Sequence, residues 1–163
     1  MVAHLAIFLL FGSLYLFADD NNYLLFGISV KPSFNKLSDS WWISQGRDFP
    51  LFGTFTGGYE TGMAYRISEE VAEYHFKTFF NFKYDVVYLA KSTLYVGGGA
   101  GLLELLKVEK HDSNFSFFLG YQGVLGLKIG PPKKDKFCFE IHFLDSLEEG
   151  RGLQINLLAG VKF

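Results

Sequence analysis

The chain has 163 residues, a formal net charge of −2, 49% apolar residues and 18% aromatic residues. This composition fits one folded domain and excludes a disordered chain or a polybasic nucleic-acid-binding protein, so no nucleic acid is expected among its partners. The 19 Phe and 18 Gly residues favour strands over helices.

Residues 1–18 have the features of a secretory signal peptide. Leu5 to Ala18 is an apolar run, shorter than the roughly 20 residues that a helix needs to cross a bilayer. Asp19 and Asp20 follow Ala18 at an acceptable cleavage point. Because residues 1–4 contain no Lys or Arg, a buried helix of a soluble protein stays open as an alternative. We expect residues 19–163 to form the mature domain.

Seven segments of the mature chain alternate apolar and polar residues with the period of a β-strand. They are Tyr23–Lys31, Gly53–Ile67, Tyr74–Val86, Thr93–Leu105, Phe115–Ile129, Phe137–Phe143 and Leu153–Phe163. Phe79 breaks the alternation of its segment. Between them we expect an acidic turn at Ser68–Glu73, a break near Ala90 and Lys91, a polar connection at Lys107–Asn114, and a turn at Gly130–Asp135, where consecutive prolines cannot donate to a sheet.

The last of these segments indicates where the protein resides. Its apolar residues share one face, and an aromatic residue ends the chain: Leu153, Ile155, Leu157, Ala159, Val161 and Phe163. This ending resembles the C-terminal strand of bacterial outer-membrane β-barrels, which their assembly machinery reads. Two glycine-containing segments, Gly57–Arg66 and Tyr95–Gly101, add to a layout that resembles the small outer-membrane barrels of the OmpA-like superfamily over nearly the whole mature chain. The resemblance implies the fold and the outer membrane, but no single activity.

An outer-membrane barrel of this kind has an even number of strands, so an eighth strand is needed. Residues 32–51 contain Pro32, Asn35, Asp39, Gly46 and Pro50 and are expected to be mostly loop. Ser40–Gln45 is the only plausible strand among them. The predicted fold is therefore an all-β, eight-stranded antiparallel up-and-down transmembrane barrel, closed by pairing of Tyr23–Lys31 with the last strand.

The size of the side chains predicts which face is inside. An eight-stranded barrel has an interior just wide enough for side chains to fill, and the apolar faces, rich in Phe, Tyr, Leu and Ile, would overfill it. The polar faces carry Gly58, Gly62, Gly97, Gly99 and Gly101, which suit a narrow lumen. We therefore expect the apolar face to point outward into lipid, and we expect little room for a water-filled pore.

The inward charges then require partners. We expect a lumen network of ion pairs and hydrogen bonds formed by Glu60, Lys77, Asn81, Lys83, Asp85, Gln122, Lys128, Glu140 and His142, together with Asn156. A turn at 68–73 would set Glu60 near Asn81 and diagonal to Lys83. Candidates for the aromatic girdles at the membrane interfaces are Tyr23, Tyr65, Tyr74, Tyr88, Phe163, Trp41 and Trp42.

An enzymatic alternative is a lipid A deacylase. These eight-stranded enzymes, which this chain resembles, carry a His-x-Ser-Asn motif at the end of the seventh strand. The chain has His142 and Ser146 there, with Glu148 and Glu149 beyond, but four residues of strand separate His from Ser by roughly 13 Å. His111 and Ser113 fit the motif but lie between the fifth and sixth strands. A lumen role for His142 and a loop role for His111 compete with this hypothesis.

No cofactor or metal site is expected, since the four His residues are scattered and Cys138, the only cysteine, is expected to be a small buried side chain that fills space in the fold.

The leading hypothesis is a non-catalytic outer-membrane barrel whose loops serve surface interactions. Its expected partners are outer-membrane lipid and the barrel-assembly machinery, which would recognise the strand ending in Phe163. The alternatives are the lipid A hydrolase and a soluble, lipocalin-like ligand-binding calyx.

Overall fold

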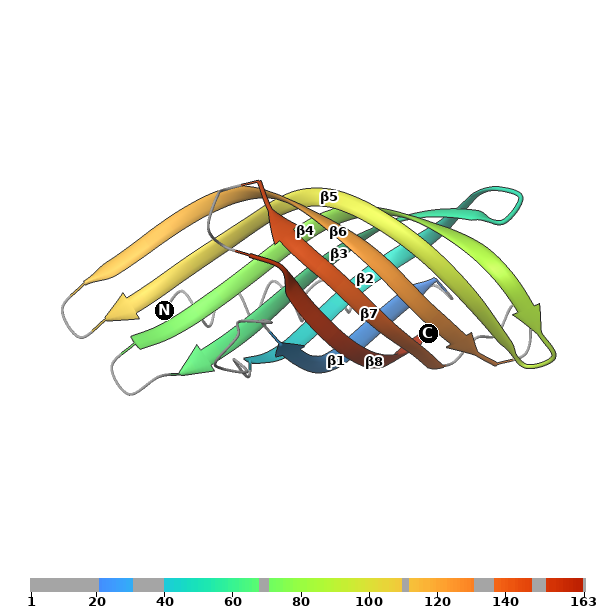
Figure 1. The fold of residues 1–163 in the computed structure, drawn as a ribbon, viewed down its shortest axis with the longest axis horizontal. Helices are drawn as coiled ribbons and strands as arrows, with labels where there is room; N and C mark the ends of the chain where they lie inside the picture. Colours follow the sequence, from blue (N-terminus) through green and yellow to red (C-terminus); the bar gives the residue numbers. More distant parts are fainter. Residues whose placement is uncertain are drawn as a thin grey trace.

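The computed structural model describes residues 21–30, 40–67, 71–109, 112–130, 137–147 and 152–162. Within these ranges the chain is an all-β barrel in which eight antiparallel strands follow one another around a closed ring (Figure 1). The strands are β1 (Asn22–Val30), β2 (Ser40–Phe52), β3 (Phe55–Ile67), β4 (Val71–Leu89), β5 (Ser92–Glu109), β6 (Ser113–Ile129), β7 (Phe137–Ser146) and β8 (Gln154–Lys162). The predicted fold class is confirmed.

The expected signal peptide and Phe163 lie outside the described residues. No helix in the described ranges is long and apolar enough to span a membrane.

Pairing of β1 with β8 closes the barrel, as expected, from Tyr23 opposite Lys162 to Val30 opposite Ile155. Paired residues can be followed from strand to strand, starting at Phe26 of β1. The path through β2, β3 and β4 reaches β5 at Glu104, and the path through β8, β7 and β6 reaches it at Leu94. One full circuit of the barrel therefore shifts the register by ten residues (104 − 94). This stagger requires strands tilted by about 40°. We call the end at which β1 begins and β8 ends the terminal end, and the opposite one the distal end.

The eighth strand is present but longer than the expected Ser40–Gln45, because β2 continues to Phe52. Gly46 does not form a turn. It lies opposite Tyr23, and a Cβ on it would be 2.3 Å from the Tyr23 ring, so the glycine makes room for an aromatic side chain. Pro50 is tolerated because it lies near the strand end, next to a register irregularity.

β4, β5 and β6 are also longer at the distal end than expected. Arg66 pairs with Glu73, and Lys107 pairs with Asn114, so residues expected in turns belong to strands. The connection between β3 and β4 is therefore shorter than the expected turn at 68–73. As a consequence Glu60 lies opposite Phe79. It is near Asn81, as expected, but it is not diagonal to Lys83.

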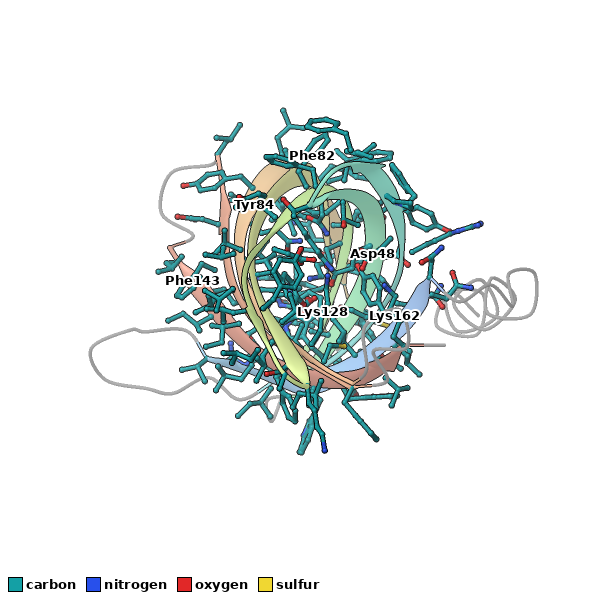
Figure 2. All side chains as sticks on the ribbon, turned by 90° about the vertical axis from the view of Figure 1, so that its right-hand side faces the viewer. Asp48, Phe82, Tyr84, Lys128, Phe143 and Lys162 are labelled. Atoms are coloured by element: carbon teal, nitrogen blue, oxygen red, sulfur yellow. The ribbon has the colours of Figure 1, made fainter. Side chains whose placement is uncertain are left out.

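The two faces of the sheet are arranged as predicted. Phe80, Phe117 and Phe139 are 67%, 60% and 51% exposed on the outside, whereas Glu60 and Lys83 are buried inside. Figure 2 looks along the barrel from the terminal end and shows Phe82, Tyr84 and Phe143 outside the ring and Asp48 and Lys128 within it. Phe79, which broke the alternation, lies inside.

Two of the girdle candidates were wrong. Tyr23 and Trp42 are buried, because their positions in β1 and β2 face the lumen, where glycines leave space for large rings. Trp41 and Tyr88 are exposed on the outside at 75% and 61%. Tyr65 and Tyr74 pack against each other at the distal part of β3 and β4, with 4.8 Å between ring centroids.

Candidate functional site in the barrel lumen

The centre of the lumen is built around the carboxylate of Glu60 on β3. Lys77 on β4 places its Nζ 2.7 Å from Glu60 Oε1. Asn81 and Gln122 donate to Glu60 Oε2 at 3.2 and 3.3 Å, and Gln122 also donates to the Asn81 oxygen at 2.8 Å. All four side chains are buried. A charge in such a place is tolerated only when it is paired and hydrogen-bonded, and this arrangement provides both.

Glu140 on β7 forms a second centre, and His142 joins it to the first. Lys83 Nζ lies 3.0 Å from Glu140 Oε1, and the Tyr95 hydroxyl donates to the same oxygen. His142 Nε2 contacts Glu140 Oε2, while Lys77 Nζ is 3.1 Å from His142 Nδ1. Because an ammonium group only donates, Nδ1 accepts and Nε2–H donates to Glu140.

Further ion pairs occupy the lumen towards the terminal end. Asp48 on β2 lies 3.3 Å from Lys83 Nζ and 3.7 Å from Lys162 Nζ, and Asp85 accepts from Lys128 Nζ at 3.0 Å. Together with the Lys77–Glu60 and Lys83–Glu140 pairs, these contacts give each of the four inward lysines a carboxylate partner. Asp48 was missed in the sequence, because its segment was expected to be loop and not strand.

Two tyrosine rings lie close to the Lys83 ammonium group. The Lys83 Nζ lies 4.4 Å from the Tyr23 ring centroid and 5.5 Å from that of Tyr95, distances at which cation–π attraction acts. Tyr95 lies opposite Gly126, where a Cβ would be 2.1 Å from the ring. This Tyr-over-Gly arrangement was also missed, since it becomes visible only when the register is known.

The distal part of the lumen holds an apolar cluster beside buried polar side chains, among them Ser29 and Asn156. Trp42, Leu105 and Leu144 are buried there, next to Leu103. A cavity of about 40 Å³ opens at this end, with His75 and Gln154 also among its lining residues. It is far smaller than the roughly 300–1,000 Å³ of small-molecule sites. The lumen therefore combines ion pairs at its centre and towards the terminal end with a mixed apolar and polar layer towards the distal end.

The structure does not bring the candidate catalytic residues together. His142 is fully buried, and its two ring nitrogens contact the Glu140 and Lys77 side chains. Ser146 lies near the distal cavity at the end of β7 and is not among the partners of His142. Ser113 is exposed at the start of β6, and His111 lies outside the described residues.

Glu60, Glu140 and His142 have the ligand types of a metal site, and their ligand atoms lie within 4.8 Å of one another. However, both carboxylates already hold lysine ammonium groups, at 2.7 Å for Lys77 and 3.0 Å for Lys83. A divalent cation at this point would be repelled by both lysines at short range. The arrangement is better suited to cross-linking the strands of the barrel than to holding a metal.

The fold is similar to those of solved outer-membrane barrels, although neither a family model nor a characterised protein sequence matches the chain. Neisserial surface protein A (NspA) aligns with a TM-score of 0.65 at 9% identity, covering 88% of this chain and 95% of NspA. The N-terminal β-barrel domain of Pseudomonas aeruginosa OprF aligns with a TM-score of 0.56 at 11% identity, covering 89% and 98%. Ail, the attachment invasion locus protein of Yersinia pestis, aligns with a TM-score of 0.52 at 10% identity, covering 89% and 100%. The chain thus has the fold of small eight-stranded outer-membrane barrels, as its resemblance to the OmpA-like superfamily implied.

Proposed function

We propose that this protein is an integral outer-membrane barrel whose role is non-catalytic, with its exterior in lipid, its lumen closed by the ion-pair network and its distal end presented at the cell surface. The observation that carries this proposal is the inversion of the usual burial pattern. Charged side chains such as Glu60 and Lys77 are buried, while Phe80 and Phe139 are exposed on the outside. A soluble calyx would need the opposite arrangement, because its apolar residues would line the ligand cavity.

The exterior also has a hollow lined mostly by apolar side chains. Its volume is about 500 Å³. Ala159 of β8 is paired with Phe26 of β1 on one side and with Phe139 of β7 on the other, and the neighbouring pair Ile28 and Leu157 also lines it. Because the strands are paired around the whole ring, they present no unpaired edge where all eight run side by side. Membrane lipid is therefore the first partner that we propose.

The assembly machinery is the second proposed partner. β8 is the strand that completes the ring, and Leu157 and Val161 are exposed on its outward face at 43% and 41%. A last strand with outward apolar residues and a terminal aromatic residue is the feature that the resemblance connects with recognition by this machinery.

A surface role is favoured by the distal end. We place the end at which β1 begins and β8 ends at the periplasmic side, so the distal end faces outward from the cell. There β6 continues beyond its pairing with β7, from Gly120 to Ser113, and β5 accompanies it to Val108. One structural neighbour, Ail, is named as an attachment invasion protein and was crystallised with a heparin analogue. We extend to this chain only the broader role of surface interaction.

Labelling of intact cells tests both the location and the orientation. Lys107 lies in the distal part of β5 with a side chain 46% exposed, and Lys91 is exposed in the turn between β4 and β5 at the terminal end. A membrane-impermeant amine reagent should modify Lys107 and spare Lys91, and both should react after lysis, as read by peptide mass spectrometry. Recovery of the protein in a soluble fraction, or preferential labelling of Lys91 in intact cells, would refute the proposal.

A further inference from the structure

The hollow on the exterior crosses five neighbouring strands, from β1 through β8, β7 and β6 to β5 (Figure 1). Its volume of about 500 Å³ lies within the roughly 300–1,000 Å³ of small-molecule sites. A single row of paired residues runs along it, and the smallest side chain of this row, Ala159, lies between two Phe rings. The row consists of Phe26, Ala159, Phe139, Leu127 and Leu94.

This row descends through one leaflet of the membrane. Half of the circuit, from β1 to β5, accounts for half of the ten-residue register shift, so Leu94 lies five residues of strand closer to the terminal end than Phe26. At about 2.5 Å of height per residue of tilted strand, this is about 12 Å. Phe26 is the middle residue of β1, and half of an apolar band about 25 Å tall is also about 12 Å. The hollow therefore runs from the centre of the bilayer to its periplasmic boundary.

A positive charge lies just beyond the lower end of the hollow. Lys91 is exposed in the turn between β4 and β5, three residues before Leu94 and thus about 7 Å closer to the periplasm. Its carbonyl accepts from Gly130 N–H at 3.0 Å, which holds the turn beside the end of β6. Lys128 on β6, by contrast, is buried in the lumen and paired with Asp85. Lys91 is therefore the lysine that this end of the hollow offers to the layer of lipid phosphates.

We propose that the hollow holds one acyl chain of an anionic phospholipid from the periplasmic leaflet, and that Lys91 binds the phosphate of the same molecule. The proposal rests on the membrane orientation given above. Lipid tails are as apolar as the lining of the hollow, so an acyl chain alone would gain little over the surrounding lipid. The attraction between Lys91 and an anionic headgroup supplies the selectivity.

A lipid of the outer leaflet fits this hollow less well. Ile28, the lining residue nearest to the distal end, lies only two residues beyond Phe26. This corresponds to about 5 Å above the centre of the bilayer. A lipid from that side would reach the hollow with the end of its chain, and its headgroup would lie far from Lys91.

Two pairs of variants test the charge and the space separately. Lys91→Gln removes the charge, and Lys107→Gln, at an exposed position of the distal end, is its control. Ala159→Phe fills the hollow, and Ala100→Phe is its control. Ala100 is also exposed and also lies between two aromatic residues of neighbouring strands, but it does not line the hollow.

Each protein would be inserted into nanodiscs that contain equal amounts of phosphatidylglycerol and phosphatidylcholine with identical acyl chains. After release from the nanodiscs, native mass spectrometry counts the lipids that stay bound to each barrel. We expect the native protein to retain one phosphatidylglycerol molecule, with a preference of about fivefold over phosphatidylcholine, which is the contribution of one lysine near a membrane surface.

Lys91→Gln should lose this preference, Ala159→Phe should retain about fivefold less of either lipid, and both controls should behave like the native protein. A native preference in Lys91→Gln, unchanged retention by Ala159→Phe, an equal loss in Lys107→Gln, or no retained lipid on an inserted native barrel would overturn the inference. Failure of the barrel to insert into nanodiscs would count against the proposed function instead.

Discussion

At the scale of single residues, the lumen is organised by pairs whose members come from different strands. The sequence could predict that Glu60, Lys77 and Lys83 face inward, because alternation along each strand decides the face. It could not predict which lysine meets Glu60. That choice depends on register, and the shorter connection between β3 and β4 makes Lys77 the partner, at 2.7 Å, while Lys83 contacts Glu140 and Asp48.

Replacing Glu60 with Gln should destabilise the barrel strongly. The substitution leaves the buried Lys77 ammonium without its counter-charge, and breaking a buried pair on one side costs about 3–5 kcal/mol. The midpoint of urea unfolding in lipid vesicles, followed by tryptophan fluorescence, would measure the loss.

Two variants control this measurement. Glu109→Gln at the exposed distal end of β5 should change the unfolding free energy by less than about 0.5 kcal/mol. Combining Glu60→Gln with Lys77→Met should recover part of the loss, because both charges are then absent. A native unfolding midpoint for Glu60→Gln alone would show that the central pair does not stabilise the lumen.

At the scale of elements, glycines determine where large lumen side chains fit. Alternation identified seven strands, and the even strand number of such barrels required the eighth, but β2 was expected too short because Gly46, Asp48 and Pro50 are also turn residues. In the barrel Gly46 lies under Tyr23, and Asp48 pairs with Lys83. These roles depend on neighbouring strands, so a local pattern could not distinguish them from a loop.

Two glycines of β6 provide a matched test of this explanation. Ala at Gly126 would place its Cβ 2.1 Å from the Tyr95 ring, whereas Ala at Gly123, on the outward face, would have its nearest contact at 3.9 Å. Gly126→Ala should therefore cost about 1–3 kcal/mol through overpacking, and Gly123→Ala should be nearly neutral. Equal unfolding midpoints for the two variants in urea would contradict the role given to the Tyr-over-Gly contact.

At the scale of the whole molecule, the decisive feature is that the barrel is apolar outside and charged inside. This could be predicted from the sequence, because the volume of a slim barrel excludes the bulky faces and alternation identifies them. The extension of β6 past the end of β7 could not be predicted. It follows from unequal strand lengths at the distal end, and the sequence there, at Lys107 to Asn114, is polar enough to be expected as a connection.

An outward charge should be costly only where lipid surrounds the barrel. Leu157 is exposed in the middle of β8, and Phe52 is exposed at the β2–β3 turn. Leu157→Arg should destabilise the protein in vesicles by about 2–4 kcal/mol, and Phe52→Arg by about 0–1 kcal/mol, as the cost falls towards the interface. Were the exterior in water, both substitutions would be close to neutral.

The most direct test of the account is to measure cross-relaxation by NMR between lipid acyl-chain protons and the methyl groups of two neighbours in β8. Leu157 is 43% exposed on the outside, and Leu158 is 3% exposed in the lumen. In nanodiscs, Leu157 should show strong transfer from the acyl chains, and Leu158 should show none. Transfer to Leu158, or water contact at Leu157 without acyl-chain contact, would contradict the claim that this barrel carries its apolar side chains in lipid.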